Sequence, residues 1–321
     1  MIYSPLLQLF AFGSLAVQAF AACKEPTVRK DWRSLTEDER DRFISAQQKL
    51  WNKDADPATN QSVYDRDFVL LHRRSTPSSH NVPGFLPWHR KFLRDYEIAL
   101  QAIDPTVSLP YWNWADDNAS LNTSLIWDKK YFGGDGQGSD YCVQDGRYAN
   151  WTLRLGGHLT DPEIDIEHCL RRMWSRGISS TRVTGPVVPS MSEIRTAIKG
   201  YNGSYEDFLP WWEGHHGTIH LGIGGFSTDL NGDMTPVTNS PNEPVFWLHH
   251  TFVDRIWAEF QESTPFAHNS YGGLPSANSQ LPSDDPIWNN GGKLSDVMKP
   301  WDVTVESAFS TKGDYYCYTY E

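Results

Sequence analysis

Eight of the eleven histidines in this chain fall into two groups. His72, His80 and His89 lie eight and nine residues apart in one segment, and five more lie between residues 215 and 250. Imidazole binds transition metals through a neutral ring nitrogen, and sites built from several imidazoles without thiolates or carboxylates suit copper or zinc. The two groups therefore predict nitrogen-rich metal sites.

The second group contains two informative spacings. His216 and His220 are four residues apart, so on a helix they would share one face and could bind one metal. His249 and His250 are adjacent on another predicted helix, and Asp254, one turn after His250, could hold a ring N–H or an arginine. A single histidine on an apolar face is more often a hydrogen-bonded core residue. Two groups in aromatic surroundings instead predict a buried, redox-active copper pair.

The elements that would position these histidines are mainly helical. A capping box at Thr36 and Glu39 predicts a helix that ends near Trp51. Further helices are predicted from about 88 to 103, 191 to 199, 205 to 222 and 243 to 262. The Ser-, Pro- and Arg-rich segment around His72 and His80 is predicted to be a loop, as are residues 116–150 and 264–300. No repeat or compositional break divides the chain, which predicts a single mainly α domain over residues 22–321.

Composition excludes several classes of function. The chain has 321 residues, 39% of them hydrophobic, which is enough for a globular core, and its net charge of -12 without a basic stripe argues against nucleic acid. The apolar N-terminus ends in Ala19-Phe20-Ala21, which predicts a signal peptide over residues 1–21 and a secreted protein. The alternative for this segment is a membrane anchor. No later segment is apolar enough to span a bilayer.

The cysteines and glycosylation sequons agree with secretion. Four cysteines allow three disulfide pairings, of which Cys23–Cys317 and Cys142–Cys169 are favoured. No two cysteines have the spacing of a thiolate metal site. Five Asn-x-Ser/Thr sequons are candidates for glycosylation: Asn60, Asn118, Asn122, Asn150 and Asn202.

Several motifs resemble the tyrosinase and polyphenol oxidase family, whose members hold a coupled binuclear (type-3) copper site. His80-x8-His89 with Pro87-Trp88-His89-Arg90 is similar to the first copper segment of that family. Residues 242–257 are similar to the second, although Glu243 stands where the family usually has Asp. Shorter similarities lie at Arg29 and Trp32, at residues 110–114, and at Tyr316-Cys317-Tyr318. The resemblance reaches from about residue 28 to the end of the chain.

The resemblance implies a four-helix bundle around two copper ions. A loop would supply two imidazoles, one helix the third, and an opposite helix pair the remaining three. The implied ligands are His72, His80 and His89 for the first copper, and His216, His220 and His250 for the second, with His249 behind them. The implied reaction is the oxidation of small o-diphenols to o-quinones by O2. Phe246 is expected to pack over an imidazole and, together with Gly217 and Leu221, to line the substrate pocket.

Two departures from the family pattern bear on activity. Ser78 stands where many members have a cysteine joined to the second ligand, so no thioether is expected. Gly217 stands where an Asn in many hydroxylating members works with a Glu, here Glu213, to hold a water that takes the phenol proton. This favours diphenol oxidation over monophenol hydroxylation.

The resemblance ends close to Tyr318, so we expect no C-terminal lid domain and an open site on a monomer or weak homodimer.

Two other functions also agree with the sequence, besides the oxidation of o-diphenols as the first reading. An o-aminophenol oxidase or a biosynthetic oxidase of one metabolite is a second reading. An O2-binding or inactive copper-binding relative is a third.

Overall fold

The computed structural model describes residues 23–158, 161–174, 187–225, 231–313 and 315–321. Its helices are α1 (Glu37–Trp51), α2 (Leu70–Ser79), α3 (Phe85–Gln101), α4 (Met191–Tyr201), α5 (Tyr205–Gly224), α6 (Phe246–Ser263) and α7 (Ile287–Asn290). The strands are short, namely β1 (Thr27–Arg29), β2 (Thr152–Leu153), β3 (His168–Cys169), β4 (Val297–Met298), β5 (Val303–Thr304) and β6 (Tyr318–Tyr320). The predicted fold class, mainly helical with long irregular loops, is confirmed.

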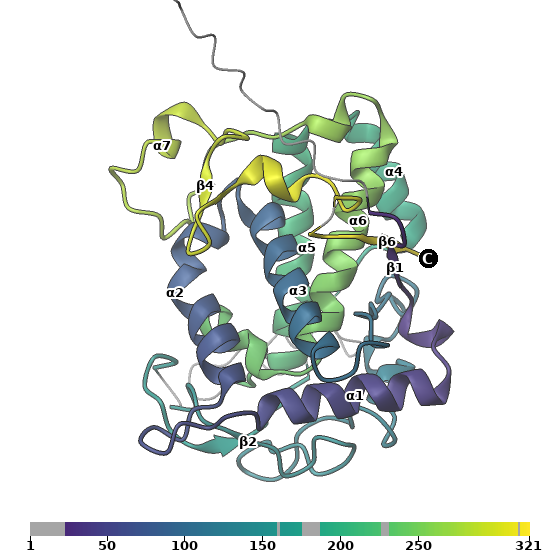
Figure 1. Cartoon of the computed structure of the whole chain (residues 1–321), viewed down its shortest axis with the longest axis vertical. Coiled ribbons are helices and arrows are strands. Elements are labelled where there is room, and N and C mark those ends of the chain that lie inside the picture. The colour runs from purple at the N-terminus through teal and green to yellow at the C-terminus, as the bar shows by residue number, and fades with distance from the viewer. Residues whose placement is uncertain (1–22, 159–160, 175–186, 226–230, 314) are drawn as a thin grey trace, which may run out of the picture.

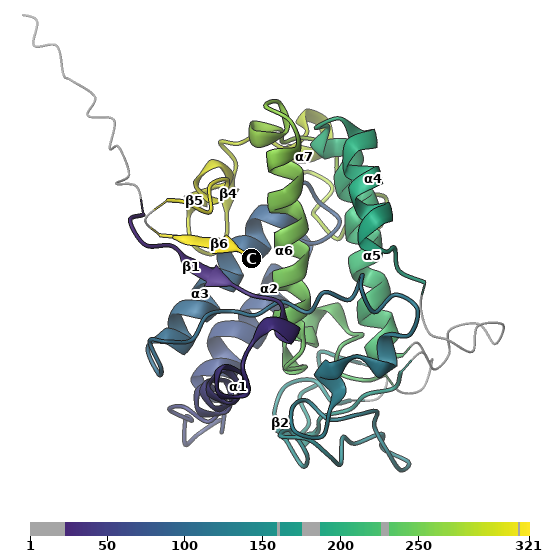
Figure 2. The ribbon, with the colours of Figure 1, turned by 90° about the vertical axis from the view of Figure 1, so that its right-hand side faces the viewer.

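Four helices form the bundle that positions the histidines. Helices α2, α3, α5 and α6 stand side by side while α1 crosses one end, and α4 covers the outer side of α5 (Figures 1 and 2). Aromatic packing joins α3 to α6: the ring of Trp247 stacks on Tyr96 with centroids 3.6 Å apart and contacts Phe92 at 5.0 Å. These three side chains are buried, so apolar burial stabilises the contact between the two helices.

Helix α2 differs from the sequence prediction, which made this segment a loop. His72 lies within α2, and His80 is the residue that caps its C-terminus. Pro77 occupies the last turn, where it cannot donate a backbone hydrogen bond. The helix nevertheless forms because one face, which includes Ser75 and Ser79, is buried. Tertiary packing therefore outweighs the low helix propensity of the segment.

Helix boundaries follow local signals where the sequence has strong ones. Thr36 and Glu39 form the predicted capping box of α1, and Ser190 and Glu193 form a second one at α4. Helix α4 ends at Asn202, which adopts the left-handed conformation that asparagine tolerates. Helix α3 has no capping side chain and begins at residue 85, three residues earlier than predicted.

The two ends of the described chain meet on one side of the bundle. Strand β1 pairs in parallel with β6, and the Cys23–Cys317 disulfide lies beside this pair. The second disulfide joins Cys142 to Cys169, so both bridges have the pairing that the sequence favoured. No helix within the described ranges is long and apolar enough to cross a membrane.

Candidate metal centre

The first histidine cluster lies between α2 and α3. His72 comes from α2, His80 from the residue after it, and His89 from the second turn of α3. Their ring centroids are 5.0 Å apart for His72–His80, 4.8 Å for His80–His89 and 5.6 Å for His72–His89. All three are buried, and one nitrogen of each lies within 4.8 Å of the others. The arrangement has the size of a three-imidazole metal site.

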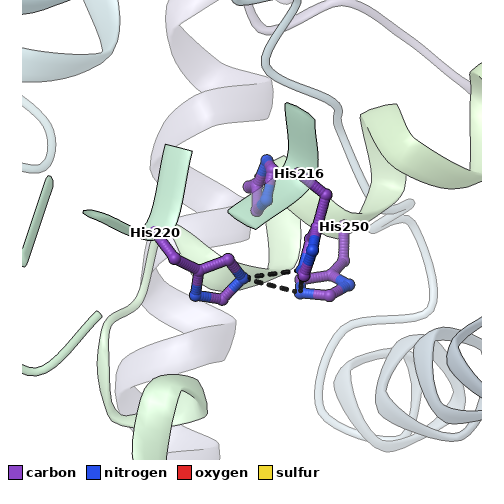
Figure 3. Close-up of side chains that lie close together, drawn as sticks. His216, His220 and His250 are labelled. Carbon is purple, nitrogen blue, oxygen red and sulfur yellow. Dashed lines mark hydrogen bonds between the residues drawn. The ribbon is translucent and has the colours of Figure 1, made fainter. Parts of the chain in front are cut away.

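The second cluster is tighter and comes from α5 and α6. The Nε2 atoms of His216 and His220 are 2.8 Å apart, and each lies 3.2 Å from Nε2 of His250 (Figure 3). A metal about 2 Å from each nitrogen, the usual imidazole–metal bond length, would fit between three nitrogens at such separations.

The hydrogen bonds of the opposite ring nitrogens show that these atoms suit a cation. Nδ1 of His220 lies 2.8 Å from the carbonyl oxygen of Met234, and Nδ1 of His216 lies 3.3 Å from that of Glu213. A carbonyl only accepts, so both Nδ1 atoms donate and both Nε2 atoms carry lone pairs. Two facing lone pairs repel unless a cation lies between them. His89 repeats the pattern, because its Nδ1 donates to the Phe85 carbonyl and its buried Nε2 has no hydrogen-bond partner in the part of the chain that the structure describes.

The electrostatic environment keeps these imidazoles neutral. Burial lowers the pKa of each of the six ligand candidates, and that of His220 falls to about 4. For the five candidates other than His220, neighbouring imidazoles also lower the pKa. Neutral imidazoles present lone pairs at neutral pH, and all-nitrogen donor sets suit copper. The two clusters therefore fit a dicopper site.

A fourth imidazole, His249, lies beside the second cluster. Its ring stacks on His216 with centroids 5.1 Å apart and 10° between the ring planes. Trp114 Nε1 lies 3.2 Å from Nδ1 of His249. An indole N–H can only donate, so this Nδ1 accepts and the proton of the neutral ring sits on Nε2. In this tautomer His249 has no lone pair left for a metal, which favours His250 over its neighbour.

A pocket of about 460 Å³ opens over both clusters. His80 from the first cluster and His216 from the second both line it, and so do Glu213 and Gly217. A ring that entered this pocket would approach the facing nitrogens of the two clusters at once. Glu213 and Gly217 therefore both border the pocket that opens over the clusters.

Two other predicted pocket residues lie elsewhere. Phe246 is fully buried beneath the second cluster, with its ring 4.1 Å from that of His250, so it packs on an imidazole as expected but does not line the pocket. Leu221 is 36% exposed and also lies outside the lining. It follows His220 on α5, and the rotation of one residue on a helix, about 100°, turns its side chain away from the cluster.

Glu213 is held by the segment that follows His80. Its Oε1 accepts a hydrogen bond of 2.7 Å from the backbone N–H of Asn81. Burial raises the pKa of the Glu213 carboxyl to about 8, although this hydrogen bond acts in the opposite direction. The carboxyl therefore joins α5 to the first cluster as well as facing the pocket.

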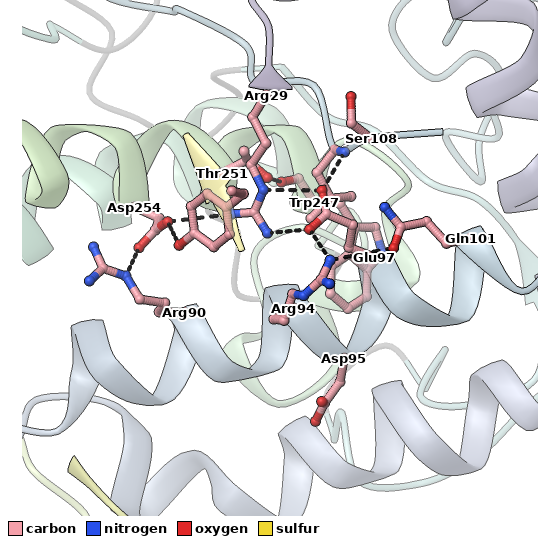
Figure 4. A network of polar contacts seen from close by, with 12 residues as sticks. Arg29, Arg90, Arg94, Asp95, Glu97, Gln101, Ser108, Trp247, Thr251 and Asp254 are labelled. Carbon is pink, nitrogen blue, oxygen red and sulfur yellow. Dashed lines mark hydrogen bonds and ion pairs between the residues drawn. The ribbon is translucent and has the colours of Figure 1, made fainter. Parts of the chain in front are cut away.

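A buried ion network fixes the helices behind the clusters (Figure 4). Asp254 accepts a hydrogen bond of 2.6 Å from Arg90 and lies 3.4 Å from Arg29, so it holds arginines and no imidazole. Tyr318 and Tyr320 each donate to Asp254 at 2.5 Å. Tyr318 and Tyr320 thus complete the network, whereas the hydroxyl of Tyr316 has no hydrogen-bond partner among the described residues.

The fold and site define a class: a mainly helical protein whose four-helix bundle carries two all-histidine clusters, each of which could hold a metal ion. The family model for the common central domain of tyrosinase matches residues 57–263. Tyrosinase of Streptomyces antibioticus is 32% identical over 301 residues, which cover 88% of this chain and 95% of that protein. Tyrosinase-like protein phomQ1' of Diaporthe leptostromiformis is 35% identical over 324 residues, covering 93% of this chain and 81% of that protein.

The fold comparison agrees with the sequence comparisons. The polyphenol oxidase of Thermothelomyces thermophila, solved as a G292N mutant, superposes with a TM-score of 0.71 at 24% identity, covering 92% of this chain and 89% of that one. This chain belongs to the tyrosinase family, whose members act on phenolic substrates. It is a tyrosinase-family copper oxidase.

Three features of the site were missed by the sequence analysis. These are the Asn81 amide on Glu213, the Trp114 indole on His249 and the Met234 carbonyl on His220. The first two join residues more than 100 positions apart, and the third uses a backbone atom. No side-chain pattern in the sequence predicts such contacts. Trp114 does belong to residues 110–114, which resemble a family segment, but that resemblance does not predict its contact with His249.

Proposed function

We propose that this protein oxidises o-diphenols to o-quinones with O2 and hydroxylates monophenols more slowly. We further propose that copper is bound by the six imidazoles of His72, His80, His89, His216, His220 and His250. The observation that carries the diphenol preference is Gly217, which lines the pocket directly after His216. O2 is the co-substrate that the family relationship supports.

The chain's own residues contribute binding and proton transfer. Bound copper would supply the electron exchange between the phenolic substrate and O2. The pocket orients the ring toward both clusters, and Glu213 is the carboxyl group placed to accept a proton there. A monophenol must lose a proton with a pKa near 10 before it can bind a metal as phenolate, whereas a catechol is the easier acid. Gly217 has no side chain to hold a water for that step.

The test is oxygen uptake by the copper-loaded protein on catechol and on tyrosol. We expect catechol to react at least about tenfold faster, a barrier difference of about 1.4 kcal/mol. Gly217→Asn should narrow this gap, because an amide side chain could hold the water that glycine cannot. A Cβ added at Gly217 meets nothing within 4 Å. Gly200→Asn on α4, where a Cβ also meets nothing, is the matched control. Equal rates on both substrates in the unaltered protein would refute the diphenol preference. Faster turnover of o-aminophenol than of catechol would instead favour an o-aminophenol oxidase.

We also propose that the protein is secreted after cleavage behind Ala21. The predicted signal peptide lies outside the described residues. Support comes from the two disulfides and from the sequons, of which Asn60, Asn122, Asn150 and Asn202 are exposed and Asn118 is half-buried. N-terminal sequencing of protein from culture medium should find Ala22, and glycosidase should lower its apparent mass. Met1 at the N-terminus of the exported protein would contradict the cleavage.

A further inference from the structure

The pocket over the clusters is almost free of charge. Fifteen of the described residues line it, and those that can ionise are His80, His216 and Glu213. The two imidazoles belong to the candidate metal centre, and Oε1 of Glu213 already accepts the Asn81 amide N–H. Within the described part of the chain, the lining contains no lysine, arginine or aspartate to pair with a charged group on a substrate.

The outer wall of the pocket is also uncharged. It comes from residues 274–280, which the segment after His80 holds in place: Ser276 donates its backbone N–H to the Asn81 carbonyl at 2.9 Å and its hydroxyl to the Asn81 side-chain oxygen at 3.1 Å. Asn278 and Gln280, both exposed, offer neutral amides at the rim. Leu274 adds an apolar side chain that is 63% exposed. The rim thus offers hydrogen bonds and apolar contact, but no countercharge.

From this lining we infer that the site selects phenols and catechols whose ring substituent is uncharged, such as an alcohol or an amide. A charged substituent that leaves water for the rim of this pocket loses hydration and gains no ion pair there, whereas an alcohol can hydrogen-bond to the rim amides. The inference rests on the proposed function. The inferred preference for uncharged substituents differs from the effect of overall charge, because a chain with a net charge of -12 would by itself attract cationic substrates.

Three catechols of equal length test this inference: hydroxytyrosol, dopamine and 3,4-dihydroxyphenylacetate. All three already carry both ring oxygens, so the comparison does not depend on hydroxylation. We expect kcat/KM for hydroxytyrosol to exceed that of either charged analogue by at least about fivefold. If dopamine or 3,4-dihydroxyphenylacetate matches hydroxytyrosol, the inference is overturned. If none of the three is oxidised by the copper-loaded protein, the proposed function itself fails.

A charge placed at the rim gives the second test. Gln280→Lys should raise the kcat/KM ratio of 3,4-dihydroxyphenylacetate to hydroxytyrosol by about two- to fivefold, the effect of one exposed ion pair, and lower the ratio for dopamine. Thr59→Lys adds the same charge at an exposed position outside the pocket and is the matched control. An equal shift in both variants would show that overall charge, not the pocket, sets the preference. Asn278→Lys repeats the test should Gln280→Lys fail to fold.

Discussion

Asp254 joins the two helices that carry ligand candidates from different clusters, so its removal is expected to weaken the bundle at that point. Its carboxylate pairs with Arg90, the residue after His89, and lies on α6 one turn after His250. Asp254→Asn keeps the shape but removes the charge, and its amide N–H groups would face donors from Arg29, Tyr318 and Tyr320. Arg29 keeps its ion pair with Glu97, so Arg90 is the buried arginine that loses its carboxylate, and an uncompensated buried charge costs about 3–5 kcal/mol. At about 2 °C per kcal/mol for a chain of this size, the Tm should fall by roughly 6–10 °C.

The assay is thermal unfolding of the metal-free protein, so that metal binding does not contribute. Asp41→Asn is the matched control, because Asp41 pairs with Arg147 on the surface, where an ion pair is worth at most about 1 kcal/mol. A Tm for Asp254→Asn that falls no further than that of Asp41→Asn would refute the reasoning. It would mean that the arginines are satisfied without the carboxylate.

The same variant should change the acid sensitivity of the fold. Burial would raise the pKa of Asp254, but Arg90, Arg29 and the tyrosine hydroxyls together lower it below its ordinary value. A carboxyl whose pKa is depressed in the folded state stabilises it above the unfolded pKa, near 4, and loses this contribution as pH falls through the folded pKa. The stability difference between Asp254→Asn and the unaltered protein should therefore be largest above about pH 4 and shrink below it.

The remaining predictions concern the metal ligands and Glu213. His250→Ala should abolish binding of the second copper in a titration of the metal-free protein, whereas His249→Ala should retain two copper ions per chain with affinity reduced about 10–100-fold, as for residues that orient ligands; the reverse order would reassign the ligand. Glu213→Gln can still accept the Asn81 N–H but cannot take a proton, so it should keep copper and lose tyrosol hydroxylation. Glu213→Leu can neither accept the Asn81 N–H nor take a proton, so we expect it to lose copper as well as tyrosol hydroxylation. Equal copper loss in Glu213→Gln and Glu213→Leu would mean that the charge of Glu213, not its hydrogen bond, supports the site.

Sequence patterns predicted the parts of the site that depend on neighbours along the chain. The His216–His220 spacing became one helix face, and the capping box at Thr36 became the start of α1. Helix α2 was missed because Pro77 and the serines have low helix propensity, and the packing that compensates comes from distant residues. The pocket wall was missed for the same reason, since residues 274–280 meet Asn81 almost 200 positions away.

Two of the polar contacts that join the elements of the two clusters differ in kind. On the closed side, Arg90 and Asp254 join α3 to α6 through a buried charge pair next to His89 and one turn from His250. On the pocket side, Glu213 joins α5 to the segment after His80 through one hydrogen bond to a backbone amide. A buried ion pair with several further partners resists displacement, whereas a single hydrogen bond contributes about 1 kcal/mol. Of these two contacts, we therefore expect the ion pair on the closed side to contribute more to the spacing of the clusters. The pocket side, where we propose that the substrate binds, is held by the weaker of these two polar contacts.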